Sequence, residues 1–153
     1  MRHPVVMSTF TVTKLQTRLP VADADAAIEF YRAALGATLT QRINTPDGKV
    51  IHAELDLGAA GTISVKEADG ADPVPSGPGP LISIYVDDAD AAAESFLAAG
   101  GTVIYPVSDW AYGERAGRLS DPFGVQWGIA QITEDLSNEE IQRRTDEMFR
   151  EAG

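Results

Sequence analysis

Two side chains capable of acid–base chemistry lie two residues apart in a run that alternates like a β-strand. His52 and Glu54 would therefore project from the same face of that strand. Such a pair can exchange protons with a substrate, ligate a divalent metal, or sit in a hydrogen-bonded network with Arg18 or Lys66. The residues alone leave these three interpretations open.

Few other reactive groups are available. The 153 residues include two histidines, His3 and His52, and no cysteine. Disulfides, thiol nucleophiles and cysteine-ligated zinc are therefore excluded, and a Ser-His-Asp triad has little imidazole to draw on. The formal net charge of −11 would repel phosphate backbones, so we expect no nucleic-acid partner. The same charge slightly favours a cationic ligand.

Hydropathy indicates a protein without a membrane partner. No apolar run reaches the roughly 18–20 residues that a membrane-spanning helix needs. The first seven residues contain one arginine but neither the long apolar stretch nor the cleavage site of a signal peptide. We therefore expect a cytoplasmic location.

An internal repeat organises the chain. Residues 21–36 align with residues 86–101 at an offset of 65, and ten of the sixteen aligned positions are identical. In each copy, a strand leads into an Asp-capped helix, and Gly36 or Gly101 is expected to end that helix in the left-handed conformation. The repeat predicts two matched modules.

Alternation and turn signals predict three further strands in each module. The expected strands are 15–21, 38–44, 50–57 and 62–67 in a module covering about 14–67, and 81–86, 102–107, 115–120 and 125–132 in a module covering about 81–132. A Pro/Gly-rich linker spans 68–80, and a helix over about 138–151 follows the capping box from Ser137 to Glu140. The predicted fold class is α+β, a single domain of two tandem βαβββ modules that form a cup-shaped mixed sheet, plus a C-terminal helix.

This arrangement resembles the vicinal oxygen chelate superfamily, which includes glyoxalase I, bleomycin-resistance proteins and extradiol dioxygenases. The runs that carry the resemblance are residues 22–31, 52–55, 112–115, 121–124 and 134–137, and they are similar to the phosphonate-operon-type glyoxalase-like branch. The resemblance implies a cup that takes a small organic molecule and a homodimer in which paired modules complete the site.

The resemblance also implies four metal-ligand positions, one on each of four strands. Gln16 suits the first, but the others carry Ser64 or Lys66, Leu81 and Gly128. Val125 and Ile132 stand where many relatives of this branch carry histidine. A divalent ion needs several converging nitrogen or oxygen ligands, so we expect neither a metal nor another cofactor.

Alternation divides the strand residues between two faces. The apolar face is expected to pack under the helices and comprises Ile63, Val65, Ile82, Ile84, Val86, Trp127 and Ile129. The opposite face would line the cup, with a loop at 109–115 acting as an aromatic lid. The predicted ligand-binding residues are Gln16, Arg18, His52, Glu54, Ser83, Tyr85, Trp110, Tyr112, Arg115 and Gln126.

The expected function is metal-free binding of a drug or secondary metabolite, with resistance by sequestration. The alternative is a lyase or isomerase of the glyoxalase or dioxygenase type that uses His52 and Glu54, with or without a divalent metal. A third possibility is a dimeric protein whose cup no longer binds anything. Only the first two assign a task to the polar face of the strands.

Overall fold

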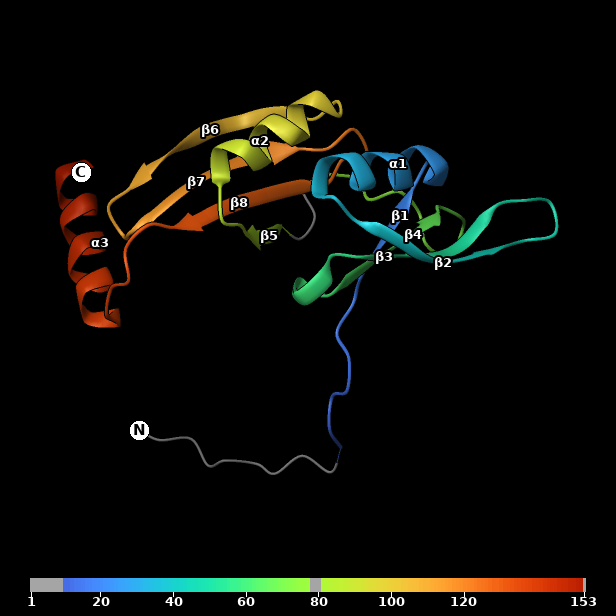
Figure 1. Cartoon of the computed structure of the whole chain (residues 1–153), viewed down its shortest axis with the longest axis horizontal. Helices are drawn as coiled ribbons and strands as arrows, with labels where there is room; N and C mark the ends of the chain where they lie inside the picture. The colour runs from blue at the N-terminus through green and yellow to red at the C-terminus, as the bar shows by residue number, and fades with distance from the viewer. Residues whose placement is uncertain (1–9, 78–80, 153) are drawn as a thin grey trace.

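The computed structural model describes residues 10–77 and 81–152 (Figure 1). The first module contains β1 (Thr17–Val21), α1 (Ala24–Leu35), β2 (Thr38–Asn44), β3 (Val50–Asp56), a 3-10 turn (Gly58–Ala60) and β4 (Thr62–Glu67). The second contains β5 (Ile82–Tyr85), α2 (Ala89–Ala98), β6 (Thr102–Trp110), β7 (Glu114–Ser120) and β8 (Gln126–Ile132), and α3 (Asn138–Ala152) follows it. The described residues do not include 1–9, for which the sequence predicts no signal peptide, or 78–80, the last three residues of the predicted linker.

Both repeated helices begin as their sequence predicts. The side chains of Asp23 and Asp88 each accept a 3.0 Å hydrogen bond from the backbone three residues on, which caps α1 and α2. Gly36 ends α1 with a φ of 66°. The matching prediction for Gly101 is wrong by one residue, because the positive φ of 111° belongs to Gly100. Gly101 instead allows close packing, since a Cβ there would lie 2.9 Å from the Phe96 carbonyl oxygen.

The strands form two four-stranded mixed sheets that confirm the predicted fold class. Their orders are β1-β4-β3-β2 in the first sheet and β5-β8-β7-β6 in the second. The β1–β4 and β5–β8 pairs are parallel and the others antiparallel, as repetition of one unit requires. Figure 1 shows α1 and α2 on the same side of the two sheets. We call the opposite side the cup face.

The core lies between the sheets and these helices, as alternation predicts. Ile63, Val65, Trp127 and Ile129 are buried, and the three apolar residues at 82, 84 and 86 pack against them in part. Aromatic rings from both modules meet there, with centroids 5.4–6.2 Å apart, and they belong to Phe30, Tyr31, Phe96, Phe123 and Trp127. The two modules therefore share one core.

A buried carboxylate fastens this shared core. Asp121 accepts hydrogen bonds from the Tyr31 hydroxyl at 2.5 Å and from Trp127 Nε1 at 2.9 Å. It also accepts from the backbone N–H groups of Phe123 and Val125, at 2.8 and 3.0 Å. Burial, together with the neighbouring Asp121, raises the pKa of Tyr31 far above its ordinary value. One side chain of the second module thus holds α1 of the first.

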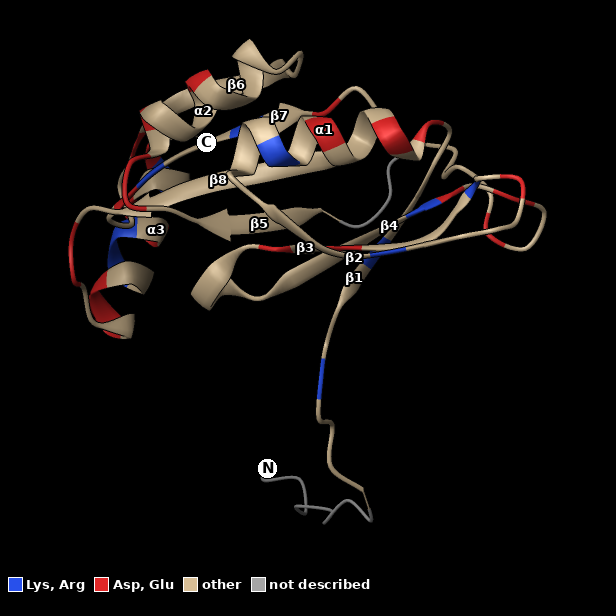
Figure 2. Ribbon diagram, turned by 45° about the vertical axis from the view of Figure 1, so that its right-hand side comes forward, with Lys and Arg blue, Asp and Glu red and all other residues tan. Residues whose placement is uncertain are grey.

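The C-terminal helix α3 extends from the end of the second module. The Ser137 hydroxyl accepts a 3.1 Å hydrogen bond from the backbone N–H of Glu140, which confirms half of the predicted capping box. Arg144 links the helix to Glu134 at 2.7 Å and to the carbonyl oxygen of Ala111 at 3.3 Å. Figure 2 shows acidic residues on α1 and α3 and in the connecting turns. Within residues 10–77 and 81–152, no helix is both long and apolar enough to cross a membrane.

Acid should weaken the first turn of α3 through Glu140. Hydrogen bonds from Arg143 and Arg144 lower the pKa of Glu140 from 4.5 to about 2. A carboxyl group whose pKa is lower in the folded than in the unfolded state stabilises the fold above pH 4.5, and this contribution is lost as the pH falls toward 2. We expect the Glu140 carboxyl chemical shift, followed by NMR, to titrate near pH 2. Titration near pH 4.5 would contradict this assignment.

Candidate functional site

The cup face of the first sheet carries a row of polar residues. Strand register places Arg18 beside Ser64 and Ser64 beside Glu54, so three adjacent strands contribute to one row. The Ser64 hydroxyl is buried and has no hydrogen-bond partner among the described residues. Alternation correctly predicted this polar face.

Glu54 is the centre of a network on this sheet. Its Oε1 accepts from Lys14 Nζ at 2.9 Å and from Gln16 Nε2 at 3.0 Å, and its Oε2 accepts from the Thr40 hydroxyl at 3.3 Å. The Gln16 amide also donates to the Thr62 hydroxyl at 2.7 Å. These donors, Lys14 first, lower the pKa of Glu54 below its ordinary 4.5. Glu54 is therefore a carboxylate that already has its own cation.

His52 and Arg18 are bound to each other. Arg18 Nη1 lies 3.0 Å from His52 Nδ1, and its Nη2 donates to the carbonyl oxygen of Ile51 at 3.0 Å. Lys66, the other expected partner of the pair, instead contacts Asp69 at 3.0 Å and Asp72 at 2.5 Å. It thereby ties the start of the linker to β4. His52 and Glu54 thus have different partners, although they share a strand.

The cup face of the second sheet carries aromatic and small residues. Register aligns Tyr105, Arg118, Gly128 and Ser83 across β6, β7, β8 and β5. The Arg118 guanidinium lies over the Tyr105 ring, with its Cζ 5.3 Å from the ring centroid. The next row on this face, toward the start of β7, contains Ala116 and Ala130. The large side chains of Tyr105 and Arg118 therefore lie next to a part of the sheet that carries only the small residues Gly128, Ala116 and Ala130.

The segment at 109–115 is not the loop that the sequence indicates. Strand β6 extends to Trp110 and β7 begins at Glu114, so only Ala111 to Gly113 form a turn. Trp110 stacks on Tyr112 with centroids 6.1 Å and planes 17° apart, and it meets Tyr105 edge-on at 6.2 Å. Continued pairing with β7 is the reason, since Asp109 and Trp110 face Arg115 and Glu114 in register.

Tyr85 completes an aromatic group on this face. Its hydroxyl lies 3.4 Å from Glu114, and its side chain is 63% exposed. Partial burial, with Glu114, Tyr105 and Tyr85 nearby, raises the pKa of Tyr112. We call Tyr85, Tyr105, Trp110 and Tyr112 the aromatic wall. Its rings come from two strands, β5 and β6, and from the turn between β6 and β7.

Arg115 lies on the other side of the second sheet. Its guanidinium contacts Asp90 of α2 at 2.7 Å and Asp109 at 3.2 Å. Register pairs Arg115 with Gln131, whose side chain accepts from the backbone N–H of Ala89 at the start of α2. Arg115 therefore joins the sheet to its helix and stands apart from the aromatic wall, although the sequence groups them.

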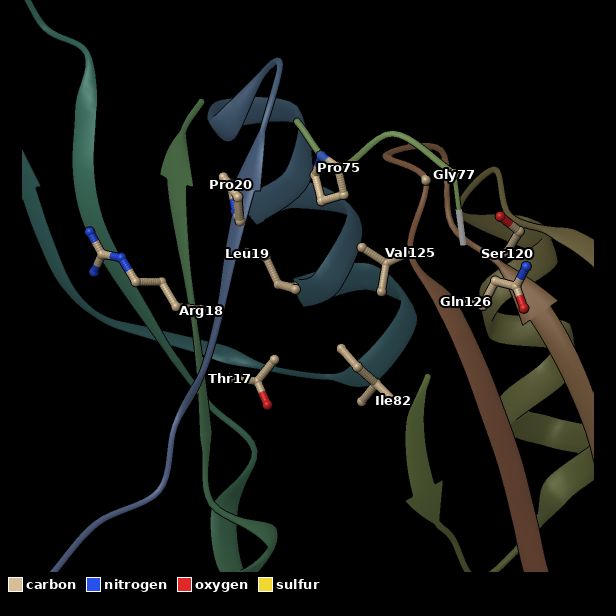
Figure 3. Close-up of a pocket in the computed structure, with 11 residues that line it drawn as sticks. Thr17, Arg18, Leu19, Pro20, Pro75, Gly77, Ile82, Ser120, Val125 and Gln126 are labelled. Carbon is tan, nitrogen blue, oxygen red and sulfur yellow. The ribbon is translucent and has the colours of Figure 1, made fainter. Parts of the chain in front are cut away.

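Two cavities lie along the seam between β1 and β5. One of about 460 Å³ lies beneath Pro75 and Gly77 of the linker and between Leu19 and Val125 (Figure 3). Figure 3 shows Arg18 pointing away from this cavity, so among the predicted residues Gln126 is the polar group at its edge. Sequence reasoning missed its apolar lining, because alternation does not show which edge strands meet.

The second cavity, of about 470 Å³, is the one that adjoins the cup of the second sheet. Ser83 and Tyr85 line it from β5, and Leu15 and Leu57 line it from the first module. Thr17 and Ile82 border both cavities. Predicted ligand residues from the second sheet thus lie beside an apolar space of drug-molecule size.

The donor set does not fit a divalent metal at the four implied positions. Leu81 and Gly128 offer no donor side chain, and the Gln16 amide is engaged by Glu54 and Thr62. Across residues 10–77 and 81–152, no group of three or more His, Cys, Asp or Glu side chains converges in a way that could hold an ion.

Comparison with known proteins agrees with the fold. A family model described as "Glyoxalase/Bleomycin resistance protein/Dioxygenase superfamily" matches residues 13–129. The chain is 36% identical over 136 residues to the uncharacterized protein Rv0887c of Mycobacterium tuberculosis, covering 84% of this chain and 79% of that protein. A Mycobacterium bovis protein, Mb0911c, is equally similar, with 84% and 89% covered.

Solved structures share the architecture. Protein PA1353 from Pseudomonas aeruginosa superposes with a TM-score of 0.67 at 25% identity and covers 80% of this chain and all of that one. TioX from Micromonospora sp. ML1 gives a TM-score of 0.64 at 24% identity, with 79% and 99% covered. These likenesses concern the fold.

Proposed function

Because the chain belongs to the glyoxalase/bleomycin resistance protein/dioxygenase superfamily, we propose that it binds a small organic molecule in its cup without a metal ion. The observation that carries this proposal is the aromatic wall, whose Tyr85 lines the seam cavity of about 470 Å³. Stacking surfaces next to an apolar space are what a drug or secondary metabolite requires, and sequestration needs no chemistry. Resistance by sequestration is the physiological role we infer.

A thermal-shift screen of metal ions, thiol adducts and aromatic antibiotics tests this function. A specific ligand at 100 times its Kd should stabilise the fold by about 2.7 kcal/mol, whatever its chemistry. We expect aromatic compounds to raise the Tm and metal ions to leave it unchanged. No shift with any class would instead favour a cup that binds nothing. One metal per subunit by elemental analysis, lost in His52→Ala, would contradict the metal-free proposal.

Trp110 should report ligand binding by fluorescence. The chain has two tryptophans. Trp110 belongs to the aromatic wall, whereas Trp127 is buried in the core and borders the seam cavity of about 470 Å³, so a ligand that stacks on the aromatic wall would quench Trp110. We expect Trp110→Phe to abolish most of the quenching and to weaken binding by about 3- to 10-fold. Phe149→Ala, at an exposed position on α3, is the matched control and should change neither. Quenching that persists in full in Trp110→Phe would come from Trp127 and would place the ligand in the seam cavity, away from the aromatic wall.

The competing function is a lyase or isomerase that uses His52 and Glu54. These two groups do lie on the cup side, which keeps the alternative testable. The lowered pKa of Glu54 makes it a weak base at neutral pH, and this favours binding over proton transfer. An enzyme of this type would lose turnover in Glu54→Gln while ligand binding persisted. Binding with no turnover in the unsubstituted protein supports sequestration.

We further propose a cytoplasmic homodimer of the phosphonate-operon-type branch. Residues 112–115 and 121–124 support the branch. Exposed apolar side chains on β6, namely Val103, Ile104 and Tyr105, support association of two copies. Sedimentation equilibrium at micromolar concentration should give twice the 16.3 kDa mass of one chain. A single-chain mass there would contradict the dimer.

A further inference from the structure

We propose that the cup of the second sheet takes a planar aromatic carboxylate and that Arg118 binds the carboxylate group above Gly128. This inference rests on the proposed small-molecule function and names its ligand class. It departs from the cationic ligand that the net charge favours, because a local cation on the cup face decides recognition at short range.

Among the described residues, Arg118 forms no ion pair with a carboxylate, as is also true of Arg18 and Arg150. Its Nε is buried and donates to no acceptor in the described part of the chain. By contrast, ion pairs engage Arg32, Arg42, Arg115, Arg143 and Arg144. The contact that the Arg118 guanidinium does make is with the Tyr105 ring, and no ion pair among the described residues includes Arg118. A buried donor of this kind points to an acceptor from outside the fold.

The two modules differ at this position in a way that isolates the charge. Register makes Glu54 beside Ser64 equivalent to Arg118 beside Gly128. Glu54 obtains a counter-ion at 2.9 Å from Lys14, which lies in the segment just before β1. Glu114, the acidic residue on the same face of β7 as Arg118, is four residues and therefore about 13 Å along the strand. In the first module the charge of Glu54 is therefore neutralised by Lys14, whereas in the second module the charge of Arg118 is left available to a ligand.

The neighbours of Arg118 leave space for an anion. Gly128 has no side chain, and a Cβ built there would lie 3.4 Å from the Ser83 hydroxyl. An oxyanion above Gly128 would lie between the guanidinium and that hydroxyl and could accept from both. A single arginine with a planar fork matches a carboxylate, whereas a phosphate dianion would need a second cation.

The rest of the cup suits a flat apolar body. Tyr85, two residues after Ser83 on the same face of β5, is mostly exposed. Both residues line the seam cavity that adjoins this cup. A ring system seated against Tyr85 would thus bring an attached carboxylate toward Ser83 and Arg118. One ligand could then stack on Tyr85 through its ring and bind Arg118 through its carboxylate.

Isothermal titration with three ligands of one shape tests the inference. The probes are naphthoate, its neutral amide and the corresponding naphthylmethylamine. We expect naphthoate to bind most tightly and Arg118→Met to weaken it by about 10- to 100-fold while the amide changes by less than about 3-fold. Gly128→Ala, with a Cβ in the anion position and no positive φ to strain, should weaken naphthoate in the same way. Circular dichroism and Tm confirm that each variant folds.

Arg32→Met is the matched control, because it removes the same charge from the outer surface of α1 and should leave naphthoate affinity unchanged. Equal affinity for the acid and the amide, or unchanged naphthoate binding in Arg118→Met, would overturn the inference but not the proposed function. Dissociation of a dimer by Arg118→Met without loss of naphthoate affinity would also overturn it, since the counter-ion would then belong to a second copy. If no naphthyl probe binds, the carboxylate inference fails, and the broader ligand screen alone decides the proposed function.

Discussion

Replacing Asp121 with alanine should lower the free energy of unfolding by about 3–5 kcal/mol. The substitution leaves the Tyr31 hydroxyl and Trp127 Nε1 without their acceptor inside the core, and it removes the acceptor of two backbone N–H groups. Buried donors without partners cost more than the net value of the bonds they lose. Urea denaturation followed by circular dichroism measures the change.

Two comparisons isolate the buried network. Tyr31→Phe removes one donor and keeps the carboxylate and the ring, so we expect a loss of about 1–2 kcal/mol. Asp47→Ala, in the exposed turn between β2 and β3, deletes a carboxylate that bonds only to its own turn and should destabilise the protein far less than Asp121→Ala. A loss below about 1 kcal/mol in Asp121→Ala would show that the modules do not depend on this carboxylate.

Replacing Gly117 with alanine should destabilise the protein by about 3 kcal/mol and weaken ligand binding as well. A Cβ at this position would lie 2.7 Å from the Val107 backbone nitrogen and 2.9 Å from the Pro106 carbonyl carbon. These are backbone atoms at the irregular pairing of β6 with β7, so relief requires β6 to move. Tyr105 and Trp110 lie on β6, and the aromatic wall would be displaced with it. Chemical denaturation and Trp110 quenching measure the two effects.

Gly128→Ala is the control for backbone crowding. Gly128 occupies the neighbouring strand β8, and the first atom that a Cβ would meet is the rotatable Ser83 hydroxyl at 3.4 Å. We expect its unfolding free energy to change by less than about 1 kcal/mol. If Gly117→Ala and Gly128→Ala lowered the unfolding free energy equally, the close approach of β6 to Gly117 would not be the cause of the destabilisation.

Local patterns in the sequence predicted most of the elements and the direction in which their side chains point, although the loop expected at 109–115 proved to be mostly strand. Asp23 and Asp88 cap helices because a carboxylate reaches the backbone three residues ahead, whatever surrounds it. Alternation separated the buried Trp127 from the polar cup for the same reason, since a strand turns successive side chains to opposite faces. The 65-residue repeat then predicted two matched modules, and the structure confirms them, each with its own four-stranded sheet.

Residues that act through distant neighbours were beyond such patterns. Asp121 has the local signature of a turn, yet it accepts a hydrogen bond from Tyr31, ninety residues earlier in the chain. The sequence gives no reason to treat Arg115 and Arg118 differently. In the folded protein, Arg115 forms an ion pair with Asp90 of α2, whereas Arg118 lies beside Gly128 and is the candidate anion site. Periodicity shows which face a side chain occupies, whereas strand register and helix packing determine its neighbours. The fold class and the polar cup therefore follow from local chemistry. The shared core, the seam cavities and an Arg118 that forms no ion pair within residues 10–77 and 81–152 exist only once the chain has folded.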